Sequence, residues 1–266
     1  MKEFITRTIT AFFLIIFAYG IIQYVPPLYF SIILFVIATM AVRELVKLTE
    51  PKMFSFLLAI VSGLIIAASF TFDRIPLSGA MFAGVFLTGM YFLWTIRQKE
   101  KLESFVRDMG IQFLVMFYLY VPLYFMLELK ELGPNYLFFM IIVIAIGDSG
   151  AYFVGSAIGK HKIYPVASPN KSLEGLIAAI ITAALSGWLA IVLFPLPVKP
   201  VTAVITGGVI GLLSQLSDPV ESLFKRSSGK KDSGELLPGH GGVLDRVDSY
   251  IFCAPALYFI IMYLWK

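Results

Sequence analysis

Basic side chains and glycines gather in the stretch SLFKRSSGKKDSGELLPGHGGVLDRVDS, residues 222–249. Gly241 and Gly242 leave the backbone free to approach a ligand closely, and His240 lies beside them. Backbone N–H groups in such a turn, followed by a helix N-terminus, can bind phosphate oxygens. An ordinary glycine turn is the alternative. The bases that could add positive charge to a phosphate site are Lys225, Arg226, Lys231 and Arg246.

Acids lie in apolar surroundings at three places, where a carboxylate is costly and by default indicates function. Asp148 lies within IGDSGAYFVGSAIGK, with Tyr152 four residues on and therefore on the same helix face. Asp218 and Glu221 lie within SQLSDPVESLFKR, where oxygen ligands at helical spacing suit a hard cation such as Mg²⁺. Asp245 and Asp248 lie where the last apolar helix begins.

Each acid also has a purely structural interpretation. Asp148 could be a buried hydrogen-bond partner, and acids in the first turn of a helix are favoured by the helix dipole alone. The residue before a proline disfavours helical geometry. We therefore expect the helix to break or kink at Asp218, with a short helix starting at Pro219 and Asp218 capping it.

A third polar segment, SPNKSLEG at residues 168–175, carries two candidate helix starts. Ser168 precedes a proline, and Ser172 lies two residues before Glu174. Lys171 lies between them and could reach a phosphate. The spacing predicts either an ordinary helix start or a contribution of Ser168, Lys171 and Ser172 to ligand binding.

Nine stretches are apolar enough to cross a bilayer, which takes about 20 mostly apolar residues. The 266 residues are 59% apolar and only 14% charged, whereas soluble proteins carry roughly 25% charged residues. The sequence predicts an all-α polytopic membrane protein, with residues 1–135 as a five-helix scaffold and residues 136–266 as a four-helix catalytic region. The nine stretches are 8–25, 28–46, 54–72, 76–96, 109–128, 136–158, 173–194, 201–224 and 249–265.

The distribution of Lys and Arg predicts the orientation of these helices. With a cytoplasmic N-terminus, 17 of the 21 Lys and Arg residues fall in cytoplasmic segments and four on the opposite side, a positive-inside bias. Loops 159–172 and 225–248 then face the cytoplasm, and the C-terminus lies on the other side. We expect an integral protein of the plasma (inner) membrane whose active site faces the cytoplasm.

The motifs in the last half of the chain resemble those of one known family. The chain has neither GxxxxGK[ST] nor a GxGxxG motif after a strand. Ser222 to Asp248 resembles the signature of the phosphatidate cytidylyltransferases, or CDP-diacylglycerol synthases, through Ser, Lys-Arg, Lys-Asp, Pro-x-His-Gly-Gly and Asp-Arg-x-Asp. DSGAYFVG at 148–155 and SPNKSLEG at 168–175 resemble two further family segments, the second with mild departures at Asn170 and Ser172.

The resemblance implies transfer of a cytidylyl group from CTP to phosphatidate, which gives CDP-diacylglycerol and pyrophosphate. The lipid phosphate would attack the α-phosphorus with help from Mg²⁺, and a second cation is left open. It implies Asp218 and Asp245 as metal ligands, with Glu221, Asp148 and Asp248 as further candidates. The implied phosphate-binding residues are Lys225, Arg226, Lys231 and Arg246, with His240, Gly241, Gly242, Ser168, Lys171 and Ser172 seating the nucleotide or headgroup.

Two other functions stay open at this point. Acids and interrupted helices within membrane spans are also typical of transporters, but the sequence shows no internal repeat. A CTP-dependent enzyme with a different lipid acceptor would share the nucleotide motifs. The expected partners are CTP, phosphatidate, membrane lipids and a second copy of the chain in a homodimer, and no nucleic acid is expected.

Overall fold

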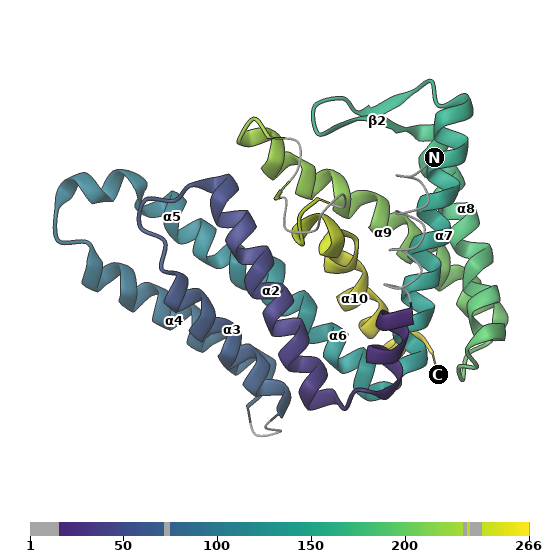
Figure 1. The fold of residues 1–266 in the computed structure, drawn as a ribbon, viewed down its shortest axis with the longest axis horizontal. Helices are drawn as coiled ribbons and strands as arrows, with labels where there is room; N and C mark the ends of the chain where they lie inside the picture. The colour runs from purple at the N-terminus through teal and green to yellow at the C-terminus, as the bar shows by residue number, and fades with distance from the viewer. Residues whose placement is uncertain (1–15, 72–74, 231–232, 235–240, 266) are drawn as a thin grey trace.

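The computed structural model describes residues 16–71, 75–230, 233–234 and 241–265 (Figure 1). Most of these residues are helical, and one two-stranded hairpin interrupts the helices. The α-helices are α2 (Pro27–Thr49), α3 (Phe56–Thr71), α4 (Leu77–Thr95), α5 (Leu102–Leu114), α6 (Val121–Leu132), α7 (Pro134–Ile158), α8 (Leu173–Leu193), α9 (Pro200–Ser227) and α10 (Leu244–Leu264). The remaining elements are the 3₁₀-helix η1 (Lys99–Lys101), the π-helical η2 (Val115–Tyr120) and strands β1 (Lys162–Tyr164) and β2 (Ser168–Ser172).

Seven helical segments of the described chain are long and apolar enough to cross a membrane. They are α2, α4, the continuous α5–η2–α6 segment of 31 residues, and α7 to α10. Helix α3 is apolar but shorter. Of the expected first span 8–25, residues 8–15 lie outside the described residues, and residues 16–24 are helical. The all-α membrane architecture is therefore confirmed, whereas the count of nine spans and the sides of the termini stay predictions.

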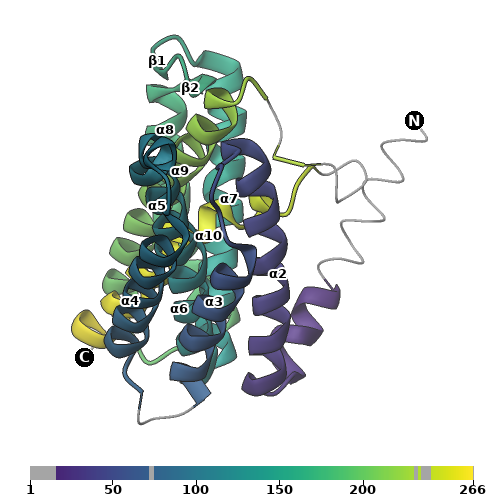
Figure 2. The ribbon, with the colours of Figure 1, turned by 90° about the vertical axis from the view of Figure 1, so that its left-hand side faces the viewer.

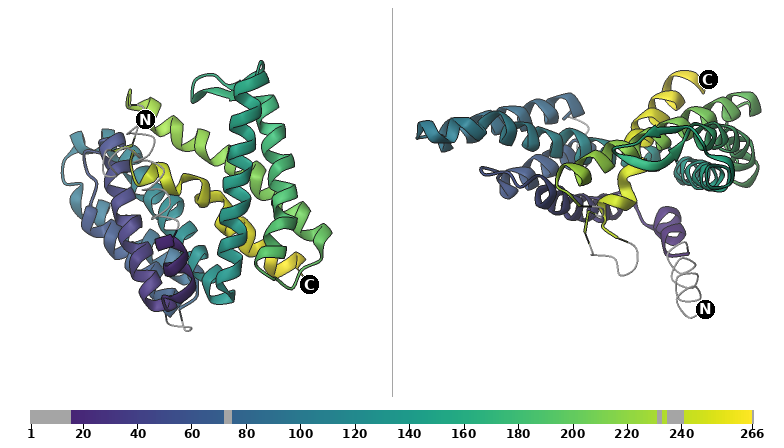
Figure 3. Two further views of the ribbon diagram at one scale, coloured as in Figure 1. Left: turned by 45° about the vertical axis from the view of Figure 1, so that its right-hand side comes forward. Right: turned by 90° about the horizontal axis from the view of Figure 1, so that it is seen from above.

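The helices form two groups with α9 and α10 between them. Figure 3 shows α2 to α6 on one side and α7 with α8 on the other, while α9 and α10 cross the space between the groups. The hairpin and the C-terminal end of α9 lie at the same end of the bundle (Figure 2). Helix α10 packs against α6 as well as α9, and α2 also contacts α9. The division at residue 135 stays a prediction, but packing contacts cross it.

Small residues allow α7, α8 and α9 to approach closely. A Cβ on Gly155 of α7 would lie 3.5 Å from the Cα of Gly175 on α8. A Cβ on Gly207 of α9 would lie 3.1 Å from the Cα of Gly187 on α8 and would overlap the carbonyl oxygen of Ala183. Because backbone atoms meet there, a side chain can enter only if the helices move apart.

Gly207→Ala is therefore expected to lower the stability of the protein by about 1–3 kcal/mol, the usual cost of overpacking a dense core. The midpoint of thermal unfolding in detergent measures this loss. The matched control is Gly89→Ala in α4, where a Cβ would meet no heavy atom of the described residues within 4 Å. Equal unfolding midpoints for the two variants would show that the close α8–α9 contact is not required.

The structure corrects two local predictions. Helix α9 continues without interruption through Pro219 to Ser227, so the predicted break at Asp218 and the new helix capped by Asp218 are wrong, whereas a kink there stays a prediction. Ser168 begins strand β2 and pairs with Tyr164 on β1, so it does not start a helix. Ser172 does, because it is the N-cap of α8 and its hydroxyl accepts a hydrogen bond from the backbone N–H of Gly175 at 3.2 Å.

Candidate active site

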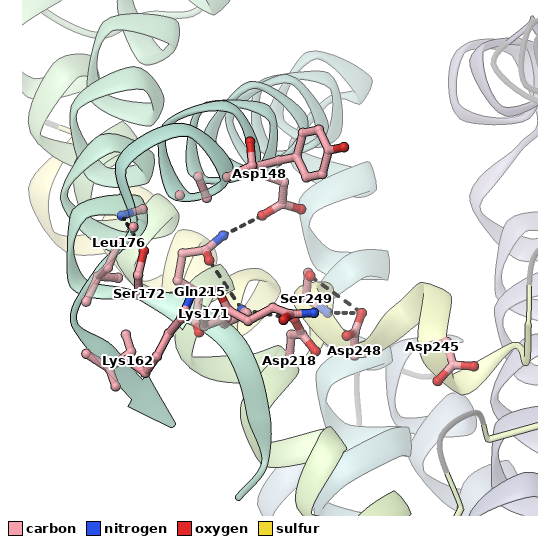
Figure 4. Close-up of a pocket in the computed structure, with 18 of the residues that line it drawn as sticks. Asp148, Lys162, Lys171, Ser172, Leu176, Gln215, Asp218, Asp245, Asp248 and Ser249 are labelled. Carbon is pink, nitrogen blue, oxygen red and sulfur yellow. Dashed lines mark hydrogen bonds and ion pairs between the residues drawn. The ribbon is translucent and has the colours of Figure 1, made fainter. Parts of the chain in front are cut away.

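A polar cavity of about 1230 Å³ lies where α7, α9 and α10 meet the hairpin and the start of α8 (Figure 4). Asp148 and Tyr152 of α7 both line it, as their spacing predicts. Asp148 precedes the last residue of α7 by ten positions, or about 15 Å at the rise of an α-helix. The cavity therefore reaches well into the helical bundle. The predicted acids that line it are Asp148, Asp218, Asp245 and Asp248.

Three carboxylates meet beside this cavity. One oxygen each of Asp218, Glu221 and Asp248 lies within 4.8 Å of the other two. Asp218 and Glu221 share a face of α9, and Asp248 comes from the second turn of α10. Glu221 is completely buried, and its Oε1 atom has no hydrogen-bond partner in the part of the chain that the structure describes. The geometry thus brings together three of the five predicted metal ligands.

Asp148 and Asp218 are joined through Gln215 and Lys171. The side-chain amide of Gln215 donates to Asp148 at 2.6 Å, and the Lys171 ammonium donates to Gln215 Oε1 at 3.3 Å. Lys171 also forms an ion pair of 2.9 Å with Asp218. Figure 4 shows Lys171 reaching from the hairpin across to Asp218. Loop 159–172 thereby supplies a cation to acids on two helices.

The uninterrupted course of α9 has a physical explanation in the same contacts. Pro219 has no N–H, so the carbonyl oxygen of Gln215, four residues earlier, loses its helical hydrogen bond. Lys171 Nζ donates to that carbonyl at 3.2 Å. A proline is tolerated within a membrane helix when another group satisfies the freed carbonyl. The missing N–H of Pro219 thus leaves the Gln215 carbonyl oxygen free to accept a hydrogen bond from Lys171, and this bond keeps Lys171 beside Asp218.

Lys225 connects the cluster of three carboxylates to the loop between α9 and α10, of which residues 228–230, 233–234 and 241–243 are described and which is called the signature loop below. Its ammonium lies 2.5 Å from Glu221 Oε2 and 2.8 Å from Asp245 Oδ1. The other oxygen of Asp245 accepts hydrogen bonds from the backbone N–H groups of Gly242, at 2.9 Å, and Ser233, at 3.3 Å. Asp245 therefore holds the loop and Lys225 together, and it is separate from the cluster of three carboxylates.

The remaining predicted residues have different positions. Lys171, Ser172, Gly241 and Arg246 line the cavity. Arg226 is exposed, and its guanidinium contacts the backbone carbonyls of residues 167 and 230. Gly242 packs against a side chain of α2, and Ser168 lies in the hairpin. Lys231 and His240 lie outside the described residues.

Three residues that sequence reasoning missed belong to this region. Gln215 joins Asp148 to Lys171, as described above. Tyr118 of the π-helical segment is buried and packs edge-on against Phe224 and Phe252, with ring centroids 5.5 and 6.4 Å away. Glu44 of α2 accepts hydrogen bonds from the signature loop. The position of Glu44 within the predicted span 28–46 is a signal of function in the sequence. Its neighbours Arg43 and Lys47 weaken that signal, because charged residues are common at a membrane boundary.

These features define a class of protein, an integral membrane protein whose helices enclose a polar cavity lined by acids and bases. Comparison with known proteins then identifies the family. The model of the cytidylyltransferase family matches residues 5–264, which is nearly the whole chain. The chain belongs to the cytidylyltransferase family.

Its relatives include curated bacterial phosphatidate cytidylyltransferases. The one from Bacillus subtilis (strain 168) is 31% identical over 245 residues, which are 89% of this chain and 90% of that protein. The one from Staphylococcus epidermidis (strain RP62A) is 33% identical over 86% of this chain and 88% of its own length. The one from Staphylococcus aureus (strain COL) is 34% identical over 85% and 87%.

Proposed function

We propose that this protein transfers a cytidylyl group from CTP to phosphatidate at the cavity beside α9 and α10, and releases pyrophosphate. The observation that carries the proposal is the meeting of Asp218, Glu221 and Asp248 next to two lysines within a membrane bundle. The family and the names of its relatives support the same reaction. One substrate is confined to the bilayer and the other to water, so the site needs access to both.

The reaction needs little acid–base catalysis by the protein. The attacking phosphate of the lipid is already an anion, so the main requirements are alignment of two polyanions and neutralisation of their charge. Two unit charges 4 Å apart repel by about 4 kcal/mol at an effective dielectric constant of 20. Carboxylates alone would increase that repulsion, which is why a cation belongs in this proposal.

The residues present fit Mg²⁺. All three clustered side chains offer oxygen ligands, which Mg²⁺ prefers, and the buried Oε1 of Glu221 is an acceptor without a hydrogen-bond partner among the described residues. Asp218, Glu221 and Asp248 would hold the ion, and Asp148 lies in the same cavity. When bound, the ion would neutralise phosphate charge. A second cation, which the family resemblance leaves open, has no ligands assigned in this proposal.

The chain's own residues would supply the rest of the site. Lys171 and Arg246 line the cavity and could bind phosphate oxygens. Lys225 is held by Glu221 and Asp245, so its ammonium keeps a fixed place at the cavity wall. Gly241 also lines the cavity and has a φ of 79°, a left-handed conformation that favours glycine. Its backbone could therefore approach a phosphate closely.

The orientation and the assembly are parts of the same proposal. The excess of Lys and Arg in the predicted inner loops supports a site that opens to the cytoplasm from the plasma (inner) membrane. Access from that side would allow CTP to enter from water while the lipid arrives from the bilayer. The family resemblance supports a homodimer.

The test is an assay with purified protein, Mg²⁺, phosphatidate in mixed micelles and CTP labelled at either the α- or the γ-phosphorus. We expect label from [α-³²P]CTP in a lipid-soluble product, and label from [γ-³²P]CTP in pyrophosphate. The matched control replaces phosphatidate with diacylglycerol, which has no attacking phosphate.

Each alternative gives a different result in this assay. A lipid kinase would place the γ-label in the lipid. A cytidylyltransferase for another acceptor would leave phosphatidate unlabelled and would transfer the α-label only after a total membrane lipid extract is added. A transporter would release no pyrophosphate. Any of these three results would overturn the proposal.

A further inference from the structure

A buried acid from the N-terminal half of the chain binds the signature loop. Glu44 of α2 is 3% exposed. Its Oε1 accepts a hydrogen bond from the backbone N–H of Val243 at 3.0 Å, and its Oε2 accepts from the N–H of Leu244 at 2.8 Å. The hydroxyl of Ser233 also donates to Oε2, at 2.9 Å. One carboxylate thus accepts three hydrogen bonds from a loop about 190 residues further along the chain.

These contacts take the place of a local helix cap. Helix α10 starts after Val243, whose side chain makes no capping hydrogen bond. The first N–H groups of a helix have no partner within the helix and need an acceptor from elsewhere. Glu44 provides that acceptor, and its negative charge lies at the positive end of the helix dipole. The start of α10, which carries Asp245 and Asp248, is therefore fixed by α2.

The glycines of the loop fit around the Glu44 carboxylate. A Cβ on Gly234 would lie 2.7 Å from Glu44 Oε1. A Cβ on Gly242 would overlap both Ser233 Oγ and the Glu44 carboxylate. The sequence interpretation of Gly242 as part of a phosphate cradle is therefore incomplete, because the structure packs this glycine against α2.

Two carboxylates hold the same loop from different helices. Asp245 binds the backbone N–H groups of Ser233 and Gly242, and it binds Lys225 through its other oxygen. Glu44 binds the Ser233 hydroxyl and the N–H groups of the next two residues after Gly242. A shift of the loop away from Glu44 would therefore move Asp245, and with it the ammonium of Lys225.

We propose that Glu44 is a positioning residue for cytidylyl transfer, which holds the loop so that Asp245 and Lys225 keep their places at the cavity. The inference rests on the proposed function, since it assumes that this cavity is the catalytic site. Glu44 is absent from the residues that line the cavity, so its effect on the reaction passes through the loop.

Glu44→Gln tests the inference, because it keeps the size of the side chain but replaces one acceptor oxygen by an NH₂ donor. We expect kcat to fall at least 100-fold per folded enzyme, a larger effect than on KM for CTP. Hydrogen exchange at the amides of Val243 and Leu244 should accelerate more than tenfold. A residue that only stabilises the fold would lower the unfolding midpoint and leave kcat of the folded fraction unchanged.

Asp108→Asn is the matched control. Asp108 is completely buried and likewise accepts two backbone N–H hydrogen bonds, from Lys52 at 3.3 Å and Met53 at 3.0 Å. The loop that Asp108 binds joins α2 to α3, and none of its residues, all of which are described, lines the cavity. We expect Asp108→Asn to lower the unfolding midpoint while kcat per folded enzyme stays within about twofold of the unsubstituted protein, the range expected without loss of transition-state contacts.

Two further results keep the inference open to refutation. If Glu44→Gln does not fold, Ser233→Ala serves as the test variant, because it removes one hydrogen bond to Glu44. We expect Ser233→Ala to lower kcat about tenfold, the effect of 1.4 kcal/mol. Unchanged kcat in the folded variant tested would overturn the inference. An unsubstituted protein that forms no CDP-diacylglycerol would instead overturn the proposed function, so the two failures are distinguishable.

Discussion

Asp218→Asn is expected to lower turnover about 10³-fold, the scale of losing one preorganised electrostatic group in an active site. The substitution removes the charge that pairs with Lys171 at 2.9 Å and one oxygen ligand of the three-carboxylate cluster. The Mg²⁺ concentration for half-maximal activity should also rise. Activity assays across a Mg²⁺ series in detergent measure both effects.

Two variants separate metal binding from simple charge pairing. If Asp218 only balances Lys171, the double variant Asp218→Asn/Lys171→Gln should be as active as Lys171→Gln alone, whereas loss of a metal ligand should lower its activity further. Glu131→Gln, an exposed acid near the end of α6, is the control and should leave turnover unchanged. Near-normal Mg²⁺-dependent activity of Asp218→Asn would remove the metal assignment.

Lys225→Met is expected to destabilise the protein by about 3–5 kcal/mol, the cost of leaving a buried charge without its partner. Lys225 is the ion-pair partner of Glu221, which is completely buried, and also of Asp245. The unfolding midpoint in detergent should fall well below that of Lys230→Met. Lys230 is an exposed lysine after α9 that donates to a backbone carbonyl at 3.3 Å, so its loss should cost little.

A second substitution identifies the source of the instability. Glu221→Gln in the Lys225→Met background removes the unpaired charge and should restore part of the lost stability. Activity should stay at least 100-fold below that of the unsubstituted protein, because both the base and the carboxylate are missing. An unfolding midpoint of Lys225→Met equal to that of Lys230→Met would show that the buried ion pairs do not hold the site.

Local patterns in the sequence predicted the features that depend on neighbouring residues. Helical spacing placed Asp148 and Tyr152 on one face, and both line the cavity. The position of Ser172 ahead of Glu174 predicted the helix start that it caps. The motifs in the last half of the chain indicated the family that the comparisons confirm. The roles of the site residues stay predictions that the experiments above address.

The features that the sequence did not predict depend on partners far away in the chain. The rule for residues before proline predicted a break at Asp218, but Lys171, 44 residues before Gln215, satisfies the freed carbonyl. Asp245 stays a predicted metal ligand, but its contacts with Lys225 and the loop backbone were not predicted. Glu44 looked like part of a scaffold because its partners follow about 190 residues later. No local spacing rule encodes such contacts.

The hydrogen bonds of Glu44 also set an order of events during biosynthesis. Ser233 follows Glu44 by 189 residues, which a ribosome adds in about 10–40 s at 5–20 residues per second. Throughout that interval the Glu44 carboxylate lacks its final donors. The last part of the chain to be translated therefore supplies the donors for an acid on one of the first helices, and a chain truncated before Ser233 lacks these hydrogen bonds to Glu44.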